Sequence, residues 1–259
     1  MITSPNPTDL ADAPNPLRRR PLRNLLKRLS VVAFSALTRL EIIGEENLPR
    51  AGPLLLVGNH FSFIDPVAVV RMAPWPVEFV GGAVTPHAPL WTRIIPFLWG
   101  YHKLYRGTGS RNALRNAEKI LKSGRIISIF PEGGNWAMVL RPARPGTAFL
   151  ATRTGAQVLP LGLYGFTRVF PSLGKGRRAH VTINIGKPFG PFSADGTGRD
   201  HRSRLDEIGH EIMRHVAELL PPDVRGCYSD DPAIREAARG SERYPWADKV
   251  EGEVVGEIH

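Results

Sequence analysis

A short apolar run that stops abruptly in polar residues constrains the fold of this chain more than any other feature. Residues 53–57 read PLLLV, and the run ends at Gly58, after which His60 and Asp65 follow before apolar residues resume. A run this short fits a buried strand better than a helix. Open α/β folds place their chemistry where a strand ends and the next helix begins, so this stretch predicts a functional site at one edge of a sheet.

His60 and Asp65 offer a specific chemistry at that position. A carboxylate that reaches an imidazole can fix one tautomer and stabilise the charged ring, which makes the other ring nitrogen a usable base. Taken alone, the pattern is more often a solvated turn histidine followed by an aspartate that caps a helix. It therefore needs support from elsewhere in the chain.

A second apolar run, over residues 126–130, supplies that support. It leads into Glu132 and two glycines, and no other acid between Asp65 and Asp195 follows an apolar run in a glycine turn. One strand end with a histidine and an aspartate, and another with a glutamate beside flexible backbone N–H groups, together indicate a single site.

The order of these motifs resembles the glycerolipid acyltransferase family, of the 1-acylglycerol-3-phosphate acyltransferase type. Four blocks follow the family's order, namely NHFSFID at 59–65, YHKLYR at 101–106, FPEG at 130–133 and QVLPLG at 157–162. The resemblance covers roughly residues 40–188. It implies an α/β fold with a mixed, mostly parallel central sheet flanked by helices.

The resemblance also implies a role for each matching residue. His60 and Asp65 are expected to be catalytic, as the general base and the carboxylate that orients it. The expected substrate-binding residues are Asn59, Ser62, Arg106, Glu132, Gly133 and Arg144. Within this set Arg106 would hold an anionic headgroup, and Glu132 would bind an acceptor hydroxyl or keep the site in shape. No metal or tightly bound cofactor is implied, because the donor is itself a substrate: acyl-CoA, acyl carrier protein or acyl phosphate.

One block departs from the family pattern. FPEG is usually followed by Thr-Arg-Ser, and this chain has Gly134, Asn135 and Trp136 instead. The missing arginine is normally counted among the groups that bind the acceptor phosphate, so the acceptor is left open. Either Arg141 or Arg144 restores the lost charge, or a lysolipid or glycolipid binds differently with Trp136 as an apolar wall.

The N-terminal region combines basic charge with helical periodicity. Residues 1–17 are proline-rich and are predicted to be a disordered tail, and residues 18–40 are predicted to form an amphipathic helix. Its apolar face would hold Leu22, Leu25, Leu26, Leu29, Val32 and Ala33. Such a helix suits an anionic membrane surface, and packing of its apolar face on the domain is an equal alternative. The stretch is too charged to span a membrane and has no evident cleavage site, which predicts a cytoplasmic protein peripherally associated with the membrane.

The remaining chain is predicted to form one acyltransferase domain over residues 41–220 and an acidic tail over 221–259. Helices are expected over 65–72, 110–122 and 200–219, and strands over 39–43, 76–82 and 181–186 in addition to those already described. Residues 83–100 are expected to be a loop-rich segment that lines an acyl tunnel, contacts lipid or packs as a lid. His102 in the second block has no evident partner in the sequence.

The charge balance bears on the class of partner. A net charge of +10 and an acid-free stretch between Glu132 and Asp195 favour anionic lipids, phosphorylated substrates or an acidic acyl carrier. Nucleic acid is not expected, because no recognised binding motif accompanies the charge. Two other functions stay open beside acyl transfer: a thioesterase or lipid hydrolase that uses the same histidine, and a non-catalytic membrane-binding module.

Overall fold

The computed structural model describes residues 19–82, 94–104, 110–194, 197–243 and 245. The predicted tail over residues 1–17, most of the predicted loop-rich segment and Arg106 lie outside these ranges.

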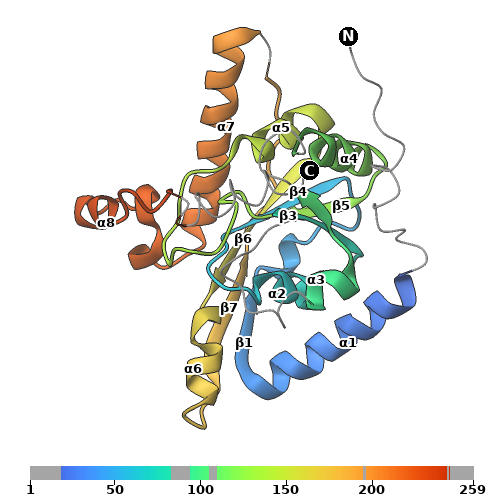
Figure 1. Cartoon of the computed structure of the whole chain (residues 1–259), viewed down its shortest axis with the longest axis vertical. Coiled ribbons are helices and arrows are strands. Elements are labelled where there is room, and N and C mark those ends of the chain that lie inside the picture. Colours follow the sequence, from blue (N-terminus) through green and yellow to red (C-terminus); the bar gives the residue numbers. More distant parts are fainter. Residues whose placement is uncertain (1–18, 83–93, 105–109, 195–196, 244, 246–259) are drawn as a thin grey trace, which may run out of the picture.

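A seven-stranded sheet forms the centre of the molecule, in the order β1-β7-β6-β2-β5-β3-β4 (Figure 1). Neighbouring strands are parallel except for β6 and β7, which are antiparallel. The sheet is therefore mixed and mostly parallel, as predicted. Its strands are β1 (Thr38–Ile43), β2 (Leu54–Gly58), β3 (Val77–Gly82), β4 (His102–Leu104), β5 (Ile126–Ile129), β6 (Gln157–Tyr164) and β7 (Ala179–Ile185).

Helices cover both faces of the sheet, which explains why the central strands are apolar throughout. Every residue of β2 and β5 is buried. One face packs against α1 (Arg20–Leu37), α2 (Asp65–Met72) and α6 (Val169–Leu173), and the other packs against α4 (Ser110–Lys122), α5 (Pro145–Thr154) and α7 (Gly198–Glu218). The parallel strands β2, β5 and β6 consequently end at one edge, where the motif residues follow them.

Three short elements differ from the sequence prediction. Part of the predicted loop-rich segment forms α3 (Ile94–Trp99), and two elements were not predicted at all, namely β4 and α6. The C-terminal region continues as η5 (Pro222–Val224), η6 (Gly226–Tyr228) and α8 (Pro232–Ala237). The other short helices are η2 (Glu45–Asn47) and η4 (Phe166–Arg168).

Helix α1 packs with an unexpected face toward the domain. It buries Arg23, Ser30 and Phe34, whereas several of its largest apolar side chains point to solvent. The exposed fractions are 53% for Leu25, 54% for Leu29, 65% for Val32 and 44% for Leu37. The alternative that α1 packs its apolar face on the domain is therefore wrong for these positions, although Leu26 does contact the core.

A buried acid explains why α1 turns the side that carries Arg23 toward the domain. Glu78 on β3 accepts hydrogen bonds from the Arg23 guanidinium at 2.7 and 3.0 Å, and it also pairs with Arg125. His102 lies 3.7 Å from the same carboxylate, so this histidine does have a partner. Burial alone would raise the pKa of Glu78, but the bonds and charges from His102, Arg23 and Arg125 outweigh it and lower the pKa to about 2. Because the guanidinium must face this acid, the leucines on the opposite side of α1 face outward.

None of the helices in the described part of the chain is both long enough and apolar enough to cross a bilayer.

Candidate active site

His60 and Asp65 meet at the edge where β2 ends and α2 begins. His60 Nδ1 lies 3.1 Å from Asp65 Oδ2, and the same oxygen accepts the backbone N–H groups of Phe61 at 2.8 Å and Ser62 at 2.7 Å. Burial raises the pKa of Asp65, while the His60 ring and the two backbone groups act to lower it. The two backbone N–H groups need a lone pair on Oδ2, so Oδ2 is the unprotonated oxygen and accepts the Nδ1 proton of His60.

This arrangement leaves the second ring nitrogen of His60 for chemistry. The His60 ring stacks on Phe130 with a centroid distance of 4.4 Å, and its side chain is 17% exposed. An imidazole whose Nδ1 proton is held by a carboxylate presents Nε2 as the basic nitrogen. The ring is thus fixed from one side and open to a small part of the surface.

Glu132 connects the second strand end to the first. Its Oε1 accepts the backbone N–H of His60 at 2.8 Å, and its Oε2 accepts Arg141 Nε at 3.0 Å. The side chain is buried, and burial raises the pKa of Glu132 to about 7 against the opposing effect of Arg141 and the His60 N–H. Since both oxygens already accept protein donors, the geometry favours the shaping role of Glu132 over direct contact with an acceptor hydroxyl.

Arg141 is buried beside Glu132. Its guanidinium also donates to the carbonyl oxygen of Gly134 and lies 3.8 Å from the centre of the Trp136 ring. Burial lowers the pKa of Arg141, and the charge of Glu132 raises it again. Its Nη1 has no partner among the described residues, but the whole side chain is buried, which argues against the alternative in which it restores the charge for the acceptor. Its proximity to Glu132 depends on how the connecting loop folds, and the sequence alone contained no signal for that.

The Gly134–Trp136 departure forms a packed turn. A Cβ atom on Gly134 would lie 2.4 Å from the Trp136 ring, so the ring can occupy this place only against a glycine. Trp136 Nε1 donates to the carbonyl oxygen of Ser241 at 2.9 Å, which ties the turn to the C-terminal region. The segment that replaces the usual Thr-Arg-Ser is thus held by Arg141 on one side and by Ser241 on the other.

Arg144 differs from Arg141 in its exposure to solvent and in the groups that it contacts. It is exposed at the start of α5, and a Cβ atom on Gly133 would meet its side-chain Cγ at 3.4 Å. Its backbone N–H donates to the carbonyl oxygen of Pro131 at 2.8 Å, which holds the residue next to the Glu132 turn. Of the two arginines, Arg144 is the one whose charge is available at the surface of the site.

Asn59 and Ser62, two of the expected substrate-binding residues, make hydrogen bonds within the protein. Asn59 is fully buried, and its amide donates to and accepts from the backbone of Leu163 at 2.9 and 2.7 Å. Ser62 is also buried, and its backbone N–H donates to Asp65. We interpret Asn59 as the residue that fixes the end of β2 to β6, and Ser62 as part of the turn that orients Asp65. That they also contact substrate stays a prediction.

The described residues contain no group of three or more His, Cys, Asp or Glu side chains arranged to hold a metal ion.

Comparison with known proteins agrees with the motif order. Residues 39–164 match the family model described as Acyltransferase. A 1-acyl-sn-glycerol-3-phosphate acyltransferase of Chlamydomonas reinhardtii is 27% identical over 80% of this chain and 61% of its own length. The enzyme of that name in Borreliella burgdorferi is also 27% identical, over 51% of this chain and 54% of its own length. The chain thus spans somewhat more than half the length of these relatives.

A solved structure has the same fold. The 1-acyl-sn-glycerophosphate (LPA) acyltransferase of Thermotoga maritima superposes with a TM-score of 0.52 at 22% identity, covering 75% of this chain and 79% of the other. The fold, the matched model and the named relatives point the same way. Residues 39–164 therefore carry an acyltransferase domain, and the chain is similar to 1-acyl-sn-glycerol-3-phosphate acyltransferases.

Proposed function

We propose that this protein is an O-acyltransferase that moves a fatty acyl group from a thioester or acyl phosphate to a hydroxyl of a lysophospholipid acceptor. The observation that carries the proposal is the His60–Asp65 pair at 3.1 Å, held at a strand end by the buried Glu132. The relatives named as 1-acyl-sn-glycerol-3-phosphate acyltransferases support this class of acceptor.

The proposed reaction uses His60 as base and then as acid. Nε2 accepts the proton of the acceptor hydroxyl as the oxygen attacks the acyl carbonyl carbon. Asp65 supports the imidazolium that forms. When the tetrahedral intermediate collapses, the carbon–sulfur bond breaks and His60 returns the proton to the departing sulfur. The new ester and the free thiol are the products.

Backbone N–H groups beside Glu132 are the proposed stabilisers of the oxyanion. The N–H of Gly133 already donates to the carbonyl oxygen of Phe130 at 3.1 Å. The N–H of Gly134, with no acceptor among the described residues, is therefore our candidate. Because its nitrogen lies in the turn that follows β5, it is on the same sheet edge as His60.

We propose that Arg144, together with Arg106, binds the phosphate of the acceptor. Arg144 is exposed next to Gly133, whereas Arg141 is buried against Glu132. A guanidinium matches the geometry of a phosphate with two parallel N–H donors. This assignment makes Arg144 the replacement for the arginine that is absent after FPEG.

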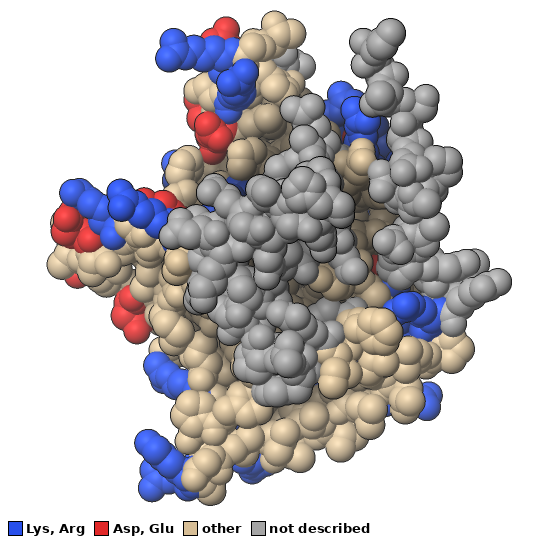
Figure 2. All heavy atoms as spheres, viewed as in Figure 1, with Lys and Arg blue, Asp and Glu red and all other residues tan. Residues whose placement is uncertain are grey.

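We further propose that α1 lies on the membrane surface with its outward stripe of Leu25, Leu29 and Val32. The residues of the stripe recur at helical spacing. Arg19 donates to the carbonyl oxygens of Phe97 and Leu98 on α3, and this short helix also exposes the side chain of Phe97. Figure 2 shows the lower edge of the molecule, over α1, as mostly uncharged. An apolar helical face with basic flanks inserts at the boundary between headgroups and acyl chains. This contact would bring the site to lipid substrates and would make the protein a peripheral membrane protein of the cytoplasm.

Thiol release from a long-chain acyl-CoA tests the proposal, measured with glycerol 3-phosphate, lysophosphatidate, a neutral lysolipid and a glycolipid as separate acceptors. Release stimulated by lysophosphatidate supports the proposal. Stimulation only by an uncharged acceptor would overturn the phosphate role of Arg144. Release that no acceptor changes would indicate the hydrolase instead. If acyl-CoA gives no release, acyl carrier protein and acyl phosphate are the next donors to test.

A further inference from the structure

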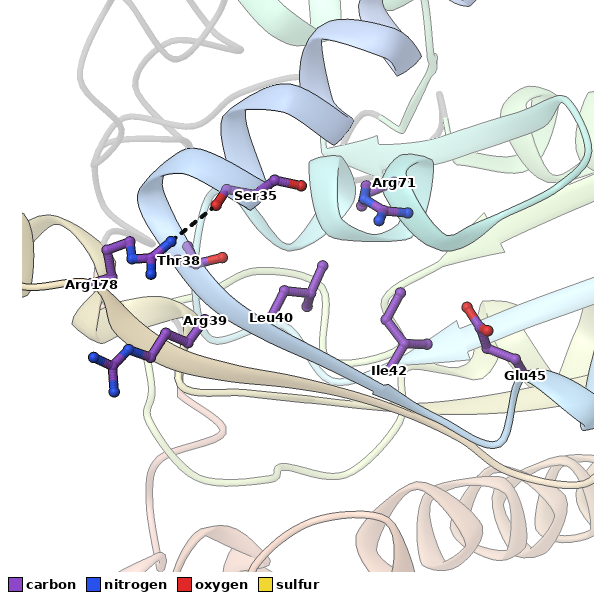
Figure 3. Close-up of a pocket in the computed structure, with 8 residues that line it drawn as sticks. All are labelled: Ser35, Thr38, Arg39, Leu40, Ile42, Glu45, Arg71 and Arg178. Atoms are coloured by element: carbon purple, nitrogen blue, oxygen red, sulfur yellow. Dashed lines mark hydrogen bonds between the residues drawn. The ribbon is translucent and has the colours of Figure 1, made fainter.

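A pocket of about 380 Å³ lies at the edge of the sheet, well away from His60. Figure 3 shows it between the end of α1, strand β1, the end of α2 and the residue that precedes β7. Asp65 begins α2 and Arg71 lies in its last turn, so the pocket is at the opposite end of this helix from the candidate active site. Six residues of helix correspond to roughly 9 Å.

Three arginines from three different elements line this pocket. They are Arg39 on β1, Arg71 on α2 and Arg178 before β7. Within the described chain none of them lies within 4.0 Å of a carboxylate. Glu45 is the one acid on the wall, and in Figure 3 it lies at the far end from Arg178.

The protein satisfies few of the donors that these arginines carry. Each guanidinium has five N–H donors. Arg178 Nη1 donates to the carbonyl oxygen of Ser35 at 3.3 Å, Arg39 Nη1 lies 3.2 Å from His180 Nε2, and the buried Nε of Arg71 has no partner in the described chain.

The walls of the pocket are not wholly polar. Leu40 and Ile42 follow each other along the wall formed by β1, with Leu40 on the side of Arg178 and Ile42 below Arg71 in Figure 3, and both pack partly against the core. The neighbouring turn of α1 carries Leu37, which is 44% exposed and follows the outward apolar stripe of Leu25, Leu29 and Val32 along the helix. A bilayer in contact with that stripe would place its headgroups at the level of the pocket, since interfacial helices sit only about 5–10 Å deep.

We infer that this pocket binds the headgroup phosphate of an anionic diacyl phospholipid. This inference rests on the proposed membrane contact of α1, and it concerns a second lipid site, separate from the one that reacts. Arginine forks recognise phosphate oxygens in pairs, and Leu40 and Ile42 on the wall accommodate the glycerol end of the lipid. The site would hold the protein in one orientation on the membrane and would not take part in acyl transfer.

A monomeric, short-chain phosphatidylglycerol is the probe of choice, because it is neither the acceptor nor the product of the proposed reaction. Binding to the full chain is measured by calorimetry, with inorganic phosphate and short-chain phosphatidylcholine as comparison ligands. The double variant Arg71→Gln/Arg178→Gln should bind phosphatidylglycerol at least about tenfold more weakly than the unmodified protein. Glu45→Gln, which removes the acid from the wall, should tighten binding about threefold.

The matched control is Lys175→Gln/Arg177→Gln, which removes the same charge from exposed neighbours that do not line the pocket. It should leave the dissociation constant within about twofold. Arg178→Gln and Arg177→Gln form a second matched pair, in case the change at Arg71 impairs folding. Acyl transfer to a monomeric acceptor should be the same in all these proteins, so a failure of the proposed enzyme activity is distinguishable from a failure of this site.

Three results would overturn the inference. Equal losses in the pocket pair and the control pair would assign binding to diffuse surface charge. Inorganic phosphate that binds as tightly as phosphatidylglycerol would make free phosphate the ligand. No binding of phosphatidylglycerol to the unmodified protein would show that the pocket takes no lipid.

Discussion

Glu132 accepts the backbone N–H of His60 at 2.8 Å, although the two residues follow different strands of the sheet. The contact joins the ends of β2 and β5, which are neighbours in the sheet. It gives Glu132 a role that does not require it to touch substrate. The position of His60, the proposed base, depends on this acid, and the acid in turn depends on Arg141.

Replacing Arg141 should therefore impair both stability and catalysis. Arg141→Gln leaves the buried Glu132 without its cation, and breaking a buried pair from one side costs about 3–5 kcal/mol. We expect a lower midpoint of urea unfolding and a lower kcat, because the His60 backbone loses its fixed acceptor geometry. Unchanged unfolding and unchanged kcat would contradict the role assigned to Arg141.

Arg144→Gln provides the contrast three residues further on. Arg144 is exposed, so unfolding should change by no more than about 0.5 kcal/mol. Loss of one phosphate contact should raise the KM for lysophosphatidate about tenfold while kcat changes little. The same variant should use a neutral acceptor as well as the unmodified protein does. An equal loss with both acceptors would exclude a phosphate-specific role.

Glu78 should make a pH-dependent contribution to stability. Its pKa is lowered to about 2 in the folded protein from 4.5, which corresponds to about 3 kcal/mol. A lowered carboxyl pKa stabilises the fold above the unfolded value. This stabilisation should be complete above about pH 4.5 and should be lost as the pH falls toward 2.

Urea unfolding of Glu78→Gln across this pH range tests the prediction. The variant should be at least about 3 kcal/mol less stable at neutral pH, and the difference should shrink in acid. Glu118→Gln is the control, because Glu118 pairs with Lys122 and Arg153 at the surface and should contribute under about 1 kcal/mol. A difference that stays constant with pH would show that packing, and not the charge of Glu78, is responsible.

The outward stripe of α1 should control binding to vesicles without contributing to the fold. Leu29→Gln/Val32→Gln removes two side chains that are already more than half exposed, so thermal unfolding should be unchanged. Cosedimentation with anionic vesicles should weaken about thirtyfold, from roughly 1 kcal/mol of apolar burial at each position.

Met138 and Ile43 are exposed apolar residues away from α1, which makes Met138→Gln/Ile43→Gln the matched control for this experiment. It should bind vesicles normally. Equal binding by both double variants would remove α1 from the membrane contact.

The local patterns predicted most of the fold because they agree with the tertiary structure. The predicted strand over 53–57 and helix over 65–72 correspond closely to β2 and α2, since buried runs and Pro66 at the start of a helix are local signals. Strand β4 has only three residues and owes its conformation to pairing with β3, which no local pattern encodes. His102 at its start finds Glu78 only through this pairing.

The orientation of α1 shows the limit of periodicity. The leucines predict an amphipathic helix correctly, but the face that packs is decided by a partner 55 residues away, the buried Glu78 that Arg23 must reach. In the candidate site the pair His60 and Asp65 is local and was predicted. The proximity of Arg141 to Glu132 follows from the path of a loop. Arg106, also a predicted site residue, lies outside the described residues and stays a prediction.

The most direct test of the central claim is acceptor-dependent thiol release by His60→Ala and Asp65→Asn, compared with the unmodified protein on acyl-CoA and lysophosphatidate. Circular dichroism and urea unfolding would first establish that both variants are folded. A general base of this kind contributes about 10²–10⁴ in rate, so we expect His60→Ala to lose at least about a hundredfold in kcat and Asp65→Asn to lose a comparable amount. Rates near normal in either folded variant would contradict the assignment of His60 as base and Asp65 as its partner.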